Sequence, residues 1–262
     1  RREQTGVSDQ DNCLIIDPAA TDQDMAYFRA MAKFVCDGLD ACGYVYCPGD
    51  MMAMNDRWCQ RLDVWEQYFA QWIAAPSTEA QMLASVMFDL RVIAGDEALF
   101  FSLHATALET AKDNSIFVAH MIANSLKHAP PLGLLRGLAT IKSGEHRNHI
   151  DMKHAGVVPV VDLGRVYALQ GRLLPVNTRA RIDDAIEIGI ISQSGGDDLF
   201  AAYDTIATTR LQHQAAQVRN GTAPDNYLSP SSIPAFERSH LRDAFVIVRT
   251  MQSSLSAQAA RS

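Results

Sequence analysis

Apolar and polar positions at the start of the chain predict a strand, a long helix and a second strand. Residues 13–16 form an apolar run that predicts the first strand. Either Thr21 or Asp22 can cap the helix that follows, and its apolar spacing continues to Cys42. Residues 44–47 then predict a short second strand, so the start reads as a βαβ unit.

The next segment predicts one more helix and one more strand. Asp63 with Glu66 three residues later fits a capping box for a helix that runs through Ile73. Residues 84–92 alternate between apolar and polar side chains, as a half-buried strand does. In that strand Asp89 points away from the buried face.

From about residue 96 onward the pattern is mainly helical, with a hairpin-like interruption between Pro130 and Pro159. The fold class predicted is α+β, with a small mixed-sheet domain over residues 1–112 and a mainly helical bundle over residues 113–262. The expected helices cover residues 97–112, 115–128, 160–169, 178–188, 197–219 and 234–254.

Charge and hydropathy limit the partners of the chain. Its 262 residues include 23 Lys and Arg against 30 Asp and Glu, a net charge of -7. This acidic balance, without a basic stripe interleaved with aromatics, disfavours a nucleic-acid backbone as the main partner. No apolar run approaches the roughly 18 residues of a membrane helix and no signal peptide is visible, so we expect a cytosolic protein.

Three groups of chemically suggestive residues are better explained by packing or by turns. The cysteines are an odd number without a Cys-x-x-Cys pair, which favours reduced, mostly buried thiols over disulfides or zinc. The tryptophans recur every seven residues, which favours a core, and the histidine cluster favours a polar hairpin over a metal site. These groups are Cys13, Cys36, Cys42, Cys47 and Cys59; Trp58, Trp65 and Trp72; and His146, His149, Asp151 and His154.

Asp9 and Asp11 are the residues that point most directly to chemistry. In an extended segment, residues i and i+2 lie on the same face, so the two carboxylates sit side by side. Like charges this close repel unless a cation lies between them, and oxygen ligands of this kind suit magnesium. The alternative is a solvated turn before a strand, where Asp and Asn are common.

The sequence around these aspartates resembles a family signature. Arg1-Arg2-Glu3-Gln4-Thr5, followed by Ser8-Asp9-Gln10-Asp11-Asn12, is similar to the second half of Gly-Ser-x-Gly-Arg-x-Glu-Gln-Thr-x-x-(Ser/Thr)-Asp-Gln-Asp-Asn. This signature belongs to a bacterial nucleotidyltransferase family, the DUF294 type, within the DNA polymerase beta-like superfamily. The family is related to the uridylyltransferase that acts on the PII signalling protein and to the glutamine synthetase adenylyltransferase.

The resemblance continues to the end of the chain and includes the family's C-terminal helical substrate-binding domain. The family's Gly-Ser turn would lie just before Arg1, so we expect an N-terminally truncated fragment with weak or no activity. Family members often carry cyclic-nucleotide-binding or CBS regulatory domains upstream of this region. The segments that carry the resemblance are 88–91, 130–133, 151–153, 156–163, 210–214 and 224–227.

The resemblance implies a site with three carboxylates. Asp9 and Asp11 would bridge two magnesium ions and Asp89 would hold the ion that activates the acceptor hydroxyl, with a nucleoside triphosphate as substrate. Arg1 and Arg91 could contact its phosphates, because the arginine fork fits phosphate oxygens. A surface or ion-paired role is the alternative for both arginines.

The helical half is expected to recognise the acceptor without doing chemistry. The polar residues placed near the cleft are Arg210, His213, Asp225 and Asn226, for which helix pairing and turn chemistry are the alternatives. The predicted function is transfer of a nucleoside monophosphate to a hydroxyl acceptor in signal transduction. A tyrosine of a small signalling protein is the acceptor that the relatives imply. The alternatives are a nucleotide-sensing module without catalysis and a structural interaction domain, in which the carboxylates would not converge.

Overall fold

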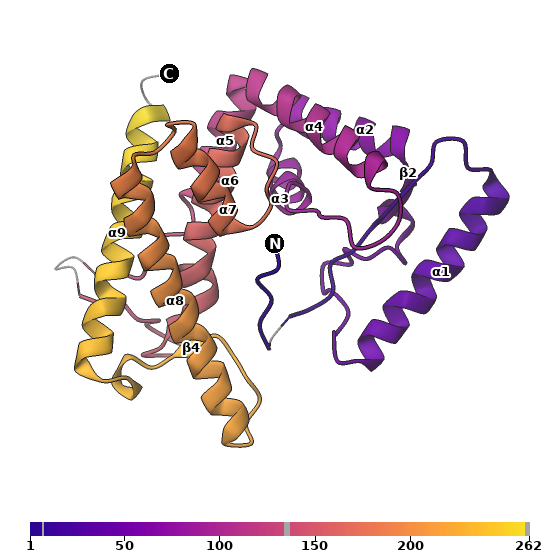
Figure 1. Cartoon of the computed structure of the whole chain (residues 1–262). Helices are drawn as coiled ribbons and strands as arrows, with labels where there is room; N and C mark the ends of the chain where they lie inside the picture. The colour runs from indigo at the N-terminus through magenta and orange to yellow at the C-terminus, as the bar shows by residue number, and fades with distance from the viewer. Residues whose placement is uncertain (7, 134–136, 260–262) are drawn as a thin grey trace.

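The structure is a computed structural model and describes residues 1–6, 8–133 and 137–259. Its first part contains β1 (Leu14–Ile16), α1 (Asp22–Ala41), a 3₁₀ turn (Asp56–Trp58), β2 (Cys59–Arg61), α2 (Leu62–Ala74), α3 (Thr78–Met87), α4 (Glu97–Asp113) and α5 (Ser115–Ser125). The second part contains β3 (Ile150–Asp151), the π-helix η2 (Met152–Val157), α6 (Val158–Gly171), α7 (Thr178–Glu187), α8 (Gln193–Arg219), β4 (Tyr227–Leu228), a 3₁₀ turn (Pro230–Ser232) and α9 (Ala235–Ala259). Figure 1 shows the N-terminal segment between α6 to α8 on one side and α1 with β2 on the other.

The first strand pairs with a different partner than the pattern predicted. β1 lies parallel to β2, with Leu14 opposite Cys59. The strand predicted over residues 44–47 is wrong as an extended element, because only Tyr46 pairs, in a parallel bridge with Gln10. In both pairings α1 lies between the two paired segments in the sequence, so the parallel arrangement of the predicted βαβ unit is kept.

The start of α1 agrees with the pattern and the start of α2 does not. Thr21 caps α1 and forms a capping box with Asp24, as expected for a Thr followed by an acid three residues later. At α2 the N-cap is Arg61, which makes no side-chain cap, so the capping box predicted at Asp63 and Glu66 is wrong.

The strand predicted over residues 84–92 is also wrong. This segment includes the end of α3, a helix capped by Ser77, whose hydroxyl accepts a hydrogen bond from the Ala80 backbone N–H. Ala80, Leu83, Ala84 and Met87 are buried at helical spacing, and that pattern competes with the alternating one. Residues 88–91 therefore lie in the turn that follows α3.

The helices of the second half begin and end near their expected bounds, with α6 as the main difference. The π-helix η2 runs directly into α6, so the helical run begins earlier than residue 160. Backbone hydrogen bonds from Ile141 N to His149 O and from Asn148 N to Ile141 O close the predicted hairpin-like interruption. Residues 134–136 of that interruption lie outside the described residues.

Two apolar cores meet at α5 and α6. Trp58, Trp65 and Trp72 are buried in the first core, as predicted from their spacing. Leu169 of α6 belongs to that core and Val166 of the same helix to the second. Helix α6 is buried almost throughout and joins the two parts.

The helices and the small sheets together confirm the predicted α+β class. No described helix is both long and apolar enough to cross a membrane. The five cysteines are free thiols, of which Cys36 and Cys59 are buried. The division at residue 112 stays a prediction.

Candidate functional site

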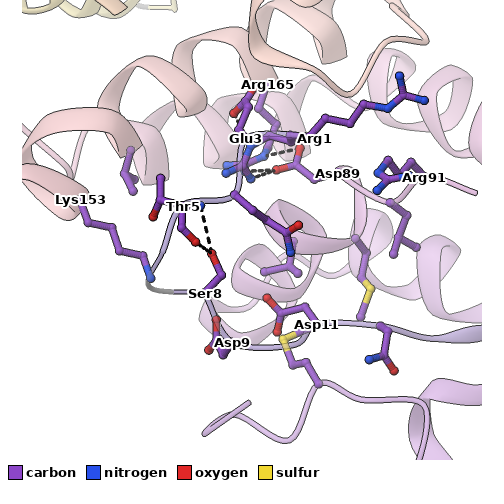
Figure 2. A pocket seen from close by; sticks show the side chains of 18 of the residues that line it. Arg1, Glu3, Thr5, Ser8, Asp9, Asp11, Asp89, Arg91, Lys153 and Arg165 are labelled. Carbon is purple, nitrogen blue, oxygen red and sulfur yellow. Dashed lines mark hydrogen bonds and ion pairs between the residues drawn. The ribbon is translucent and has the colours of Figure 1, made fainter. Parts of the chain in front are cut away.

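A pocket of about 460 Å³ lies between the N-terminal segment, the turn after α3 and the helices of the second half. Figure 2 shows Asp9 and Asp11 on one side of it and Arg165 and Lys153 on others. Six residues expected to form the site line this pocket: Arg1, Asp9, Asp11, Asp89, Arg91 and Arg210.

The Asp-Gln-Asp-Asn run alternates between pocket and interior. The Gln10 side chain is buried and its Nε2 donates to the Cys36 carbonyl and the Tyr44 carbonyl, each at 3.0 Å. The Asn12 Oδ1 accepts from the Ala53 backbone N–H at 2.8 Å. The two amides therefore anchor the segment and leave the neighbouring aspartates facing the pocket.

Asp9 and Asp11 lie side by side, as predicted, and Cys47 joins them. One oxygen from each carboxylate and the Cys47 Sγ lie within 4.8 Å of one another. The parallel pairing of Gln10 with Tyr46 explains this approach, because the next residues of the two segments are then neighbours. Among the described residues, this is the group that could hold a metal ion.

The charges around Asp11 favour a bound cation. Desolvation raises the pKa of Asp11, and repulsion from Asp9 adds to that rise. A hydrogen bond from Cys47 and the charges of Lys153 and Arg1 oppose the shift. Two close carboxylates that repel in the free protein fit a hard divalent ion, which prefers oxygen ligands; a thiol suits softer metals.

The structure does not bring Asp89 into that group. Its carboxylate is 8% exposed and pairs with three arginines: Arg1 Nη1 to Oδ2 at 2.7 Å, Arg165 Nη2 to Oδ2 at 2.6 Å and Arg181 Nη1 to Oδ1 at 2.6 Å. Burial opposes ionisation, but the charges of Arg165 and Arg181 hold the pKa of Asp89 far below its usual range. The expected third metal ligand is thus a counter-ion, because α3 ends in a turn that aims it at the arginines.

Further polar contacts tie the N-terminal segment to α7. Glu3 accepts from the Thr178 backbone N–H at 2.7 Å and from its hydroxyl at 3.1 Å. A carboxylate at this position also complements the positive end of the α7 dipole. The Asn177 side chain donates to the Arg1 carbonyl at 3.0 Å.

The two arginines assigned to phosphate binding have different surroundings. Arg1 donates to Glu3 and Asp89, so it has the ion-paired role that was the alternative. Arg91 is exposed and has no ion pair with any residue in the described part of the chain. Both side chains line the pocket.

The four acceptor-binding candidates separate into two pairs. Arg210 Nε donates to Asn226 Oδ1 at 2.7 Å, and His213 Nε2 lies 3.1 Å from Asp225 Oδ1. Only Arg210 of these four is among the described residues that line the pocket. The other three fix the turn before β4 against α8, which is the packing alternative.

The histidine cluster forms contacts typical of a polar hairpin. His146 stacks on Tyr227 with ring centroids 3.4 Å apart, and His154 Nδ1 lies 2.8 Å from Asp151 Oδ2. His149 Nδ1 lies 2.9 Å from the Arg147 carbonyl.

Sequence reasoning missed Cys47, Lys153, Arg165 and Arg181. A signal for Arg165 was present, because Asp162 and Arg165 stand three residues apart in an otherwise apolar helix, where a buried charge needs a partner. Cys47 and Lys153 had no comparable signal, since their position depends on tertiary contacts.

Comparison with known proteins assigns both parts of the chain to one family. Residues 1–79 match the family described as "Putative nucleotidyltransferase DUF294". Residues 115–259, more than half of the chain, match the one described as "Putative nucleotidyltransferase substrate binding domain". Neither a search of curated proteins nor a search of solved structures finds a match. These domains support a general role in nucleotidyl transfer. The chain belongs to the DUF294 nucleotidyltransferase family.

Proposed function

We propose that the protein transfers a nucleoside monophosphate from a nucleoside triphosphate to a hydroxyl acceptor, with magnesium held by Asp9 and Asp11. One observation carries the proposal: the carboxylates of Asp9 and Asp11 lie within 4.8 Å of each other and face a pocket that basic side chains also line. The acceptor that the relatives suggest is a tyrosine of a small signalling protein.

The chemistry needs an oxygen nucleophile and a stabilised leaving group. The acceptor oxygen forms a bond to the α-phosphorus, the bond to pyrophosphate breaks, and the acceptor proton leaves to a base or to water. Bound magnesium would supply charge neutralisation and a more acidic hydroxyl. The carboxylate oxygens of Asp9 and Asp11 fit that ion, and the Cys47 thiol would not bind it, because magnesium favours oxygen.

The protein's own cations would orient the triphosphate. Arg91 and Lys153 line the pocket without ion pairs among the described residues, so their charges are available to phosphate oxygens. Asp89 acts in this scheme as a positioning residue, because its carboxylate fixes Arg1 and Arg165 at the pocket wall.

A second candidate is a module that binds nucleotide without transferring it. The position of Asp89 favours this reading, since the expected third metal carboxylate is neutralised by arginines. In that case the pair Asp9 and Asp11 would still bind metal and nucleotide, but pyrophosphate would not be released.

The variants Asp9→Asn and Asp11→Asn test the proposal. We expect at least a tenfold loss of magnesium-dependent nucleotide affinity in calorimetry, and loss of pyrophosphate release from labelled triphosphate. The metal-free fold should be as stable or slightly more stable, because one of two like charges is removed. Asp63→Asn, an exposed acid on α2, is the matched control.

If either variant released pyrophosphate as fast as the wild type does, the metal role of these aspartates would be refuted. Metal-dependent nucleotide binding without any release, with each nucleotide and acceptor tried, would favour the binding module instead.

A further inference from the structure

Arg210 is a buried cation without a counter-ion. It lies on α8 with 7% of its surface exposed, and it lines the pocket. Its Nε donates to Asn226 Oδ1, which also accepts from Gln214 Nε2 at 3.1 Å. No carboxylate forms an ion pair with it within residues 1–6, 8–133 and 137–259, and neither Nη donates to a residue of these ranges.

A buried charge that lacks a partner is costly, so its retention needs an explanation. Asp151, the carboxylate whose charge acts on Arg210, already has other partners: it accepts from the backbone N–H groups of Lys153 and His154 and contacts the His154 ring. Burial lowers the pKa of Arg210, as expected for a desolvated guanidinium that has no paired carboxylate.

Lys153 provides a second cation on the same wall. It stands in the first turn of η2 and lines the pocket, where its side chain lies on the same side as Thr5 and Ser8 (Figure 2). Close packing fixes η2 against α8, because a Cβ on Gly156 would lie 3.3 Å from Ile206 Cγ2. The Lys153 amine forms no ion pair or side-chain hydrogen bond with a described residue.

Both cations line the pocket that the carboxylates of Asp9 and Asp11 also line. Arg165 also lines the pocket but is neutralised by Asp89 and Asp162. The helical wall therefore presents two charges that form no ion pair with any described residue.

We infer that Arg210 and Lys153 form an oxyanion site that binds a phosphate group of the ligand handled at Asp9 and Asp11. A guanidinium fork with one edge fixed by Asn226 and an ammonium that lines the same pocket together match the double charge and several acceptor oxygens of phosphate. The inference rests on the proposed function for the identity of the ligand, but the anion site itself needs no metal. The phosphate can be the tail of the triphosphate or a group on the acceptor.

The test is calorimetric binding of tripolyphosphate in the presence of a chelator. Arg210→Gln and Lys153→Gln should each weaken binding by about tenfold or more, because each removes a charge-assisted contact. Arg210→Lys should restore part of the loss. Arg249→Gln and Lys112→Gln, which remove exposed charges without ion pairs among the described residues, are the matched controls and should bind as the wild type does.

The metal ligands serve as an independent check. Asp9→Asn should bind tripolyphosphate without metal at least as tightly as the wild type, because it removes a negative charge from the pocket, so failure of the proposed catalysis does not affect this result. Thermal denaturation verifies the fold of each variant, and Lys153→Gln keeps the test valid if Arg210→Gln does not fold, because Lys153 is exposed.

Nucleotide affinity of the variants, measured in the presence of magnesium, identifies the source of the phosphate. Weaker triphosphate binding with unchanged monophosphate binding in the variants supports the triphosphate tail. Unchanged nucleotide binding, with weaker tripolyphosphate binding, supports a phosphorylated acceptor. Wild-type protein that does not bind tripolyphosphate, or variants that bind it equally well, would overturn the oxyanion site.

Discussion

Replacing Asp89 by asparagine removes the one carboxylate that Arg1, Arg165 and Arg181 share. The side chain keeps its shape but loses its charge, and its new amide group would face guanidinium donors. Arg165 still has Asp162 as a counter-ion. Arg181 is 2% exposed and keeps only the carbonyls of Pro175 and Phe88 as acceptors.

The loss should be large because the arginines stay buried. Breaking a buried ion pair by removing one partner costs about 3–5 kcal/mol. That is a substantial part of the roughly 5–15 kcal/mol that stabilises a typical domain, and it corresponds to a fall in Tm of roughly 6–20 °C. Asp22→Asn is the matched control, since its ion pair with Arg61 is exposed and such pairs contribute about 1 kcal/mol or less.

Urea denaturation at several pH values measures the effect. The pKa of Asp89 in the folded state lies well below the usual 3.8, so its stabilisation is present above that value and is lost as the pH falls below it. The wild type should therefore lose stability at acid pH more steeply than Asp89→Asn. The double variant with Arg181→Gln should be less unstable than the two single losses added together, because the two side chains interact.

Equal stability of Asp89→Asn and the wild type would refute the counter-ion role. If that variant were also inactive, the metal-ligand role predicted from the sequence would be restored.

Two further changes test the packing. His104 is 2% exposed, neither ring nitrogen has a partner among the described residues, and burial lowers its pKa from 6.5 to about 4. Between pH 6.5 and 4 the unfolded state therefore binds a proton that the folded state does not, so the free energy of unfolding should fall by about 3 kcal/mol in total over that range. In urea denaturation, His104→Leu should show a weaker pH dependence of stability than the wild type. An unchanged pH dependence would contradict the assignment. Gly196→Ala places a Cβ 2.2 Å from Ile186 Cδ1 and should cost about 1–3 kcal/mol. Gly38→Ala in α1, with nothing within 4 Å, should stabilise by about 0.5–1 kcal/mol; similar Tm shifts for both glycine variants would contradict this reasoning.

Long periodic segments could be predicted from the sequence and short apolar runs could not. Helix α4 begins at Glu97 as expected, because the helical period repeats over many residues there. Residues 84–92 are too few to distinguish the period of a strand from that of a helix. The helix forms because Ser77 caps the start of α3. Residues 44–47 do not form a strand, because their pairing with the segment at Gln10 is limited to one bridge at Tyr46.

The same distinction applies to the candidate site. Asp9 and Asp11 are two residues apart, so their proximity follows from extended backbone geometry alone. Tertiary contacts, which local spacing does not encode, bring Cys47 to the two aspartates and bring Lys153 and Arg165 to the pocket. Asp89 lines the predicted pocket, but its partners are arginines on α6 and α7, and not the predicted metal ion.

Charged side chains hold the N-terminal segment in place where regular secondary structure does not. Among the described residues before β1, strand pairing is limited to the bridge at Gln10, yet Glu3 contacts Thr178 at the start of α7 and Arg1 contacts Asp89. Buried ion pairs favour a single arrangement, because any shift leaves a charge without a partner. The position of Asp9 and Asp11 therefore depends on α7 as well as on their own strand, and the pocket is a joint product of the nucleotidyltransferase part and the helical part.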